Sequence, residues 1–121
     1  MEQQLDGLTI NGVEYVRKDS ERGVPETCKD YVIVRTYSAG VFAGYLIRRD
    51  GQEVELHNAR RIWKWAGAAS LSQLAMDGTS NPDGCKFPCA VTSIVLTQAI
   101  EIIPCTPKAK SSIQGVKEWK L

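Results

Sequence analysis

Three short apolar segments joined by tight turns constrain the fold of this chain more than any other feature. Residues 31–37 and 41–48 are rich in β-branched and aromatic side chains, and residues 53–57 alternate strictly between charged or polar and apolar ones, as strands do. The connections are short, and the second has Asp50-Gly51 at its centre, a pair favoured in hairpin turns. Consecutive strands with short connections usually pair as neighbours, so the sequence predicts an antiparallel β-meander.

The segment that follows the meander carries most of the chemistry in the chain. Residues 59–65 continue the extended pattern and predict a fourth strand. Alternation along that strand places Arg61 and Trp63 on one face and Arg60 and Lys64 on the other.

A capped helix is predicted directly after this strand. Ser70 and Gln73 have the spacing of a capping box, in which the serine caps the third helical amide and the glutamine reaches back. The helix is expected to run to about Asp77, because Gly78 is a good residue for the position after a helix.

The C-terminal part predicts one long strand and a second short helix. Residues 91–103 are the longest apolar segment and are mostly β-branched, so they are expected to form a strand that bends near residues 98–99. Thr106 followed by Pro107 is typical of a helix start, and this helix is expected to reach Ile113. The predicted fold class is therefore α+β: an antiparallel β-meander core with two short helices in the C-terminal half.

The N-terminal residues predict an extension to this domain. Residues 1–17 contain Asn11-Gly12 between two apolar segments, which indicates a hairpin. Residues 18–29 are polar, contain Gly and Pro, and are typical of a linker. The expected organisation is a hairpin extension at 1–17, a linker at 18–29 and a main β-rich domain at 30–121.

Composition argues against several classes of protein. Fifteen Lys and Arg balance fourteen Asp and Glu, so binding to long nucleic acids is not expected, although a local basic patch is compatible with this balance. No apolar segment approaches the length of a membrane span, and the polar start does not resemble a secretory signal, so a cytoplasmic location and no membrane association are expected.

Catalytic and metal-binding patterns are not found in the sequence. The four cysteines do not form the paired spacing of a structural zinc site, and His57 is the only histidine. No nucleophile motif or phosphate-binding glycine loop accompanies the serines. The chain is therefore expected to be no enzyme and to need no cofactor or metal.

The two arginines and nearby tryptophans are the first candidate binding residues. Guanidinium groups bind phosphate with two hydrogen bonds, and an indole face stacks on a base, so the segment could hold an anionic ligand with a ring. The alternative is structural: one face packs tryptophan in the core while the other exposes solvated cations. Lys108 and Lys110 lie in the first turns of the second predicted helix, where cations oppose the helix dipole, which hints at an external anion or reflects ordinary solvated lysines.

Three blocks of the sequence resemble a known family. Residues 31–44 (YVIVRTYSAGVFAG), 58–74 (NARRIWKWAGAASLSQL) and 96–103 (LTQAIEII) are similar in order and spacing to small bacteriophage and prophage proteins described as a domain of unknown function. The build is also similar to phage anti-defence sponges of the Thoeris anti-defence type, which are small β-cored oligomers.

The resemblance implies a function without catalysis. It implies that the chain sequesters a cyclic nucleotide immune signal, either of the cyclic ADP-ribose type or a cyclic oligonucleotide of the kind used in CBASS defence, in the host cytoplasm. Ligand contacts are then expected from cations, aromatic rings and polar groups, namely Arg35, Asn58, Arg60, Arg61, Trp63, Lys64, Phe87, Lys108 and Lys110.

A different function is compatible with the same residues. The chain could be a phage accessory protein that binds another protein through exposed strands and has no small-molecule ligand. In both cases a homo-oligomer, a dimer or an assembly of dimers, is expected, because spare strand edges need covering.

Overall fold

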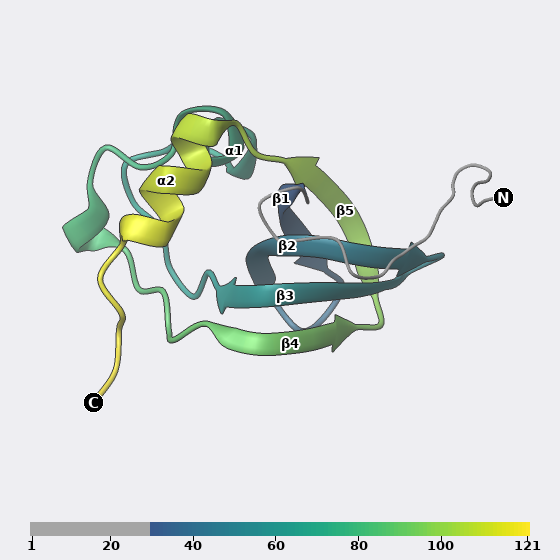
Figure 1. The fold of residues 1–121 in the computed structure, drawn as a ribbon. Coiled ribbons are helices and arrows are strands. Elements are labelled where there is room, and N and C mark those ends of the chain that lie inside the picture. Colours follow the sequence, from purple (N-terminus) through teal and green to yellow (C-terminus); the bar gives the residue numbers. More distant parts are fainter. Residues whose placement is uncertain (1–29) are drawn as a thin grey trace, which may run out of the picture.

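The computed structural model describes residues 30–121, so the hairpin and linker expected at residues 1–29 lie outside the described part. The described chain forms five strands and two α-helices (Figure 1). In order these are β1 (Tyr31–Thr36), β2 (Val41–Asp50), β3 (Glu53–Arg61), α1 (Leu71–Asp77), the 3₁₀ turn η2 (Pro82–Gly84), β4 (Val91–Leu96), β5 (Ala99–Pro104) and α2 (Pro107–Gly115).

The five strands form one antiparallel sheet in the order β4-β3-β2-β1-β5. The first four strands are a meander, and β5 pairs back with β1. This arrangement confirms the predicted α+β class, with an antiparallel meander and two short helices in the C-terminal half.

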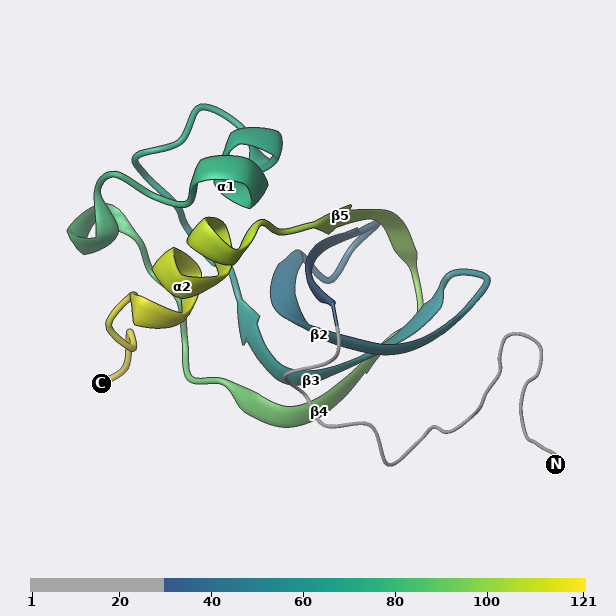
Figure 2. The same cartoon turned by 45° about the horizontal axis from the view of Figure 1, so that its top comes forward.

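The connection between β4 and β5 explains why the sheet is curled. Only Thr97 and Gln98 separate the two strands in sequence, yet the strands lie at opposite edges of the sheet. Three residue steps span at most about 11 Å, whereas the outer strands of a flat five-stranded sheet would lie about 19 Å apart. The sheet therefore rolls into a partly open barrel, as Figure 2 shows.

The curl produces two separate hydrophobic clusters. The inner cluster lies on the concave face and draws on all five strands, with Val34, Phe42 and Leu56 among its fully buried members. The outer cluster lies between the opposite face and the two helices, which both pack on one side of the barrel (Figure 2). Leu74 of α1 and Ile113 of α2 are fully buried there.

Two strand predictions were wrong. No fourth strand covers residues 59–65: residues 59–61 complete β3, and beyond them only Lys64 makes an isolated antiparallel bridge, to Lys86. The segment 91–103 is not one bent strand but two, because residues on either side of Thr97-Gln98 pair with β3 and β1 respectively. In both cases the chain changes pairing partner, which a local pattern does not encode.

Both helix starts confirm the predicted caps. The Ser70 hydroxyl accepts a hydrogen bond from the Gln73 amide at 3.2 Å, and the Gln73 side chain accepts one from the Ala69 amide at 2.7 Å. Thr106 caps α2 by accepting from the Ala109 amide at 3.1 Å. Gly78 follows α1 with φ of 76°.

Candidate functional site

Arg60 and Arg61 end β3, and alternation sends their side chains to opposite faces of the sheet. Arg60 points toward the helices and is 7% exposed. Its guanidinium donates to four backbone carbonyls: to Phe87 at 2.8 Å, Pro88 at 3.2 Å, Ile113 at 3.0 Å and Val116 at 2.7 Å.

These contacts give Arg60 a structural role. One side chain ties β3 to the segment after η2 and to the C-terminal end of α2, where backbone carbonyls lack helical partners. Burial lowers the pKa of the guanidinium, but an arginine stays charged at neutral pH. Because its donors are occupied by the protein's own backbone, we leave Arg60 out of the candidate binding site.

Arg61 lies on the concave face, at the end of the barrel where β1 ends and β2 begins. It is paired in register with Phe42, and its guanidinium carbon lies 4.7 Å from the centroid of the Phe42 ring. Within residues 30–121, no carboxylate lies within ion-pair distance of Arg61. An exposed guanidinium supported by a ring and free of an acidic partner is suited to binding an anion.

Two hollows flank the Arg61 side chain, and together they form what we call the Arg61 groove. The first has a volume of about 240 Å³ and is mainly apolar. The second has a volume of about 220 Å³ and carries hydroxyl and amide groups. The first is lined by Phe42, Ala59, Arg61, Pro88, Cys89, Val91 and Ile94, and the second includes Thr36, Ser38, Phe42, Arg61, Ile94, Thr97 and Gln98.

Two more of the predicted binding residues lie at a second surface. Trp63 is 63% exposed and stacks against Trp119, with ring centroids 6.3 Å apart. Lys64 lies across an isolated bridge from Lys86, whose ammonium lies 5.4 Å from the Trp119 ring. We call Trp63, Lys64, Lys86 and Trp119 the Trp–Lys surface.

The remaining predicted residues are scattered over the domain. Arg35 pairs with Glu101 across β1 and β5 at 3.0 Å, and Phe87 is fully buried in the outer cluster. Asn58 forms an irregular position of β3 with φ of 54°. On α2, Lys110 lies 5.1 Å from the Tyr45 ring, and Lys108 lines a hollow beside α1.

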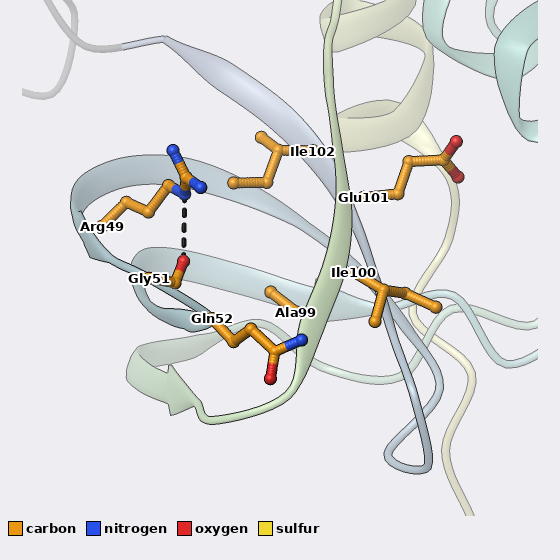
Figure 3. Close-up of a pocket in the computed structure, with 7 residues that line it drawn as sticks. All are labelled: Arg49, Gly51, Gln52, Ala99, Ile100, Glu101 and Ile102. Atoms are coloured by element: carbon orange, nitrogen blue, oxygen red, sulfur yellow. Dashed lines mark hydrogen bonds between the residues drawn. The ribbon is translucent and has the colours of Figure 1, made fainter.

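A third hollow lies beside β5 (Figure 3). Its volume is about 480 Å³, and its lining comes from the β2–β3 turn and from β5. The Arg49 guanidinium already donates to the Gly51 carbonyl at 3.0 Å, while Glu101 extends on the other side of β5 from Ile102 and is paired with Arg35. Because Arg49 and Glu101 already have partners within the protein, this hollow is a weaker candidate for a ligand site than the Arg61 groove.

The only histidine belongs to an ionic cluster on β2 and β3. Glu55 lies 3.0 Å from His57 and 3.1 Å from Arg48. The hydrogen bond from His57, with help from Arg48, holds the pKa of the Glu55 carboxyl below its usual value. Among residues 30–121, no group of three or more His, Cys, Asp and Glu side chains is arranged to hold a metal ion.

Sequence reasoning missed the residues that complete both surfaces. Phe42 supports Arg61, and Lys86 and Trp119 complete the surface around Trp63 and Lys64. All three lie far from residues 61–64 in sequence. The cation-rich segment 60–64 indicated where binding residues lie. Its partners could not be predicted, because they depend on strand register and on the path of the C-terminal tail.

The fold and these surfaces define a small α+β domain with a curled antiparallel sheet and exposed cation–aromatic sites. The chain belongs to the family described as a domain of unknown function, DUF6948, whose family model matches residues 29–113. No curated protein and no solved structure matches the chain. No helix within residues 30–121 is long and apolar enough to cross a membrane.

Proposed function

We propose that this protein is a non-catalytic binding protein that holds a nucleotide-type ligand in the Arg61 groove. The observation that carries the proposal is the Arg61 guanidinium, which lies over Phe42 between two hollows and has no acidic partner within residues 30–121. A phosphate would supply the missing counter-charge through two parallel hydrogen bonds.

The two hollows differ in polarity, as the base of a nucleotide differs from its sugar and phosphate. The first is mainly apolar, with Ala59, Pro88 and Ile94 in its lining, and suits a base. The second offers Ser38, Gln98 and other polar groups, and suits a sugar with its phosphate. Each is smaller than an ordinary ligand pocket, so a ligand would need to span both across Arg61.

The lining supports binding without cleavage. Neither hollow is lined by a histidine, an aspartate or a glutamate, so the groove offers no ordinary general base to activate water. We expect a ligand held by Arg61 to be released unchanged.

The biological setting of the proposal comes from a resemblance in build to phage anti-defence sponges. Similarity to phage anti-defence sponges suggests that the ligand is a cyclic ADP-ribose-type or cyclic oligonucleotide immune signal, and that the protein removes it from a host defence such as Thoeris or CBASS. The groove supports only the chemical class of this ligand, an anion that carries a ring.

The test is direct binding to a panel of cyclic ADP-ribose isomers and cyclic di- and trinucleotides. We expect one member to bind by calorimetry, to raise the melting temperature by linkage, and to be recovered unchanged after heat release. Arg61→Ala should weaken binding by about 10-fold or more, because hydrogen bonds to charged groups contribute about 1.5–3 kcal/mol. Arg61→Lys should rescue only part of it.

Arg48→Ala is the matched control, because this exposed arginine is already paired with Glu53 and Glu55. Binding should be unchanged in that variant. If no panel member binds the wild-type protein, or if Arg61→Ala binds as tightly as the wild type, the proposal is wrong. A ligand recovered in cleaved form would point instead to an enzyme.

A protein-interaction module is the second candidate function. It is favoured by the two outer strands, β4 and β5, whose Val95 and Ile100 are 46% and 45% exposed. Retrieval of a stoichiometric protein partner from infected cells, combined with no binding to the nucleotide panel, would support this alternative.

A further inference from the structure

We propose that the Trp–Lys surface binds single-stranded nucleic acid, by stacking bases on its indoles and holding phosphates on its lysines. This interaction is separate from the Arg61 groove and goes beyond the proposed ligand binding. Four side chains carry it: Trp63, Lys64, Lys86 and Trp119.

The two indoles are held as exposed, nearly parallel plates. Trp63 and Trp119 are 63% and 45% exposed, and their ring planes differ by 15°. The backbone fixes both residues on one segment: the Trp63 amide donates to the Lys86 carbonyl at 3.1 Å, and the Trp119 amide donates to the Phe87 carbonyl at 3.0 Å. Rings that are fixed before binding lose little entropy when a base stacks on them.

The two lysines lie directly opposite each other on neighbouring extended segments. Lys64 and Lys86 are partners in an antiparallel bridge, and directly opposite residues in such a pair project from the same face. Like charges in this position are destabilising, and within the described residues neither lysine has a carboxylate within ion-pair distance. An external anion at this point would relieve the repulsion.

The charge of Lys86 lies beside one of the rings. The Lys86 ammonium is 5.4 Å from the centroid of the Trp119 ring, so a phosphate on Lys86 would place its base within reach of an indole. The tail adds Lys117 and Lys120, of which Lys120 is paired with Glu118 at 3.4 Å. Locally the surface is cationic, although the whole chain carries a net charge of only +1.

Rings together with cations favour a single strand over the other anionic partners. Stacking requires unpaired bases, which a duplex does not offer, and it tolerates any sequence because every base has a π-face. An acidic peptide would satisfy the lysines but would leave the indole faces without planar partners. The surface spans few side chains, so the expected affinity is modest and salt-sensitive.

The test uses the tryptophans as reporters, because Trp63 and Trp119 are two of only three in the chain. Titration of the full chain with single-stranded oligothymidylate should quench their fluorescence. The slope of log affinity against log salt should be about −1.4 for two phosphate contacts. Trp119→Ala should weaken binding by about 10-fold or more, and Trp119→Phe should retain most of it.

Charge reversal and matched controls separate this surface from the rest of the molecule. Lys86→Glu should abolish binding, whereas Lys108→Glu on α2 and Tyr37→Ala, which removes an aromatic ring that is 78% exposed, should leave it unchanged. The fold of each variant is checked by its melting temperature. Arg61→Ala should also bind the oligonucleotide normally, which keeps this test independent of the nucleotide panel.

Three outcomes would overturn the inference. One is the absence of quenching by oligothymidylate at low salt. Another is an affinity for inorganic polyphosphate equal to that for the oligonucleotide, which would show that the surface recognises charge without stacking on bases. The last is competition by poly-glutamate at the same concentration as the oligonucleotide, which would assign the surface to an acidic protein partner.

Discussion

Adjacent residues at the end of β3 have different roles because a strand alternates its side chains. Arg60 donates to carbonyls of two segments, whereas Arg61 lies over a ring at the mouth of the barrel. A pair that is identical in chemistry is thus divided into a structural residue and a candidate binding residue. The division follows from which face of the sheet the helices cover.

Arg60→Ala is expected to destabilise the domain by about 3 kcal/mol, because four backbone carbonyls lose a buried, charged donor. Arg60→Lys should recover little of this loss, since one ammonium cannot reproduce the forked geometry of a guanidinium. Denaturant unfolding monitored by circular dichroism measures both changes.

Arg61→Ala is the control for this experiment, because its exposed side chain makes no hydrogen bond to the described part of the protein. Its free energy of unfolding should stay within about 0.5 kcal/mol of the wild type. Equal stability of Arg60→Ala and Arg61→Ala would contradict the structural role of Arg60.

The starts of the two helices were predicted correctly, whereas the ends of two strands were not. Capping residues act over three or four positions, so Ser70 and Thr106 identify their helices from local sequence alone. Strand ends depend on where a distant partner stops. Segment 59–65 leaves the sheet after Arg61, and segment 91–103 divides at Thr97-Gln98, because in both places the pairing partner changes.

Gly78 ends α1 where this helix packs against α2, and it is expected to tolerate no side chain. Its φ is 76°, and a Cβ at this position would collide with Ser112 of α2. Gly78→Ala should therefore cost about 2 kcal/mol of folding free energy, from backbone strain and overpacking together. The melting temperature of the variant reports this loss.

Gly115→Ala provides the matched comparison. A Cβ there meets nothing within 4 Å, so its stability should change by less than about 0.5 kcal/mol. If Gly78→Ala were as stable as Gly115→Ala, the close packing of the two helices would be wrong.

The curled sheet has two outer strands at the scale of the whole molecule. β4 and β5 each pair with one neighbour and carry exposed apolar side chains, among them Val91, Val95 and Ile100. Exposed edges of this kind favour pairing with another chain unless they are covered. The expectation of a homo-oligomer stays a prediction, and these edges are where we expect the contact.

Light scattering coupled to size exclusion is expected to give a mass above the 13.4 kDa of one chain. Val95→Lys or Ile100→Lys should lower that mass, depending on which edge is used, because a charge would have to be buried. Met76→Lys, at an exposed position of α1, should have no effect. A wild-type mass of one chain at every concentration would contradict the prediction.

Strand periodicity, turns and caps are local properties, so the class of fold, the meander, the starts of both helices and the cation-rich segment could be predicted from sequence. The curl of the sheet and the hydrogen bonds of Arg60 to backbone carbonyls emerge only on folding. The same holds for the approach of Phe42, Lys86 and Trp119 to residues 61–64. These contacts connect residues far apart in the chain. They are set by strand register and by the path of the C-terminal tail, which depend on the packing of the whole domain.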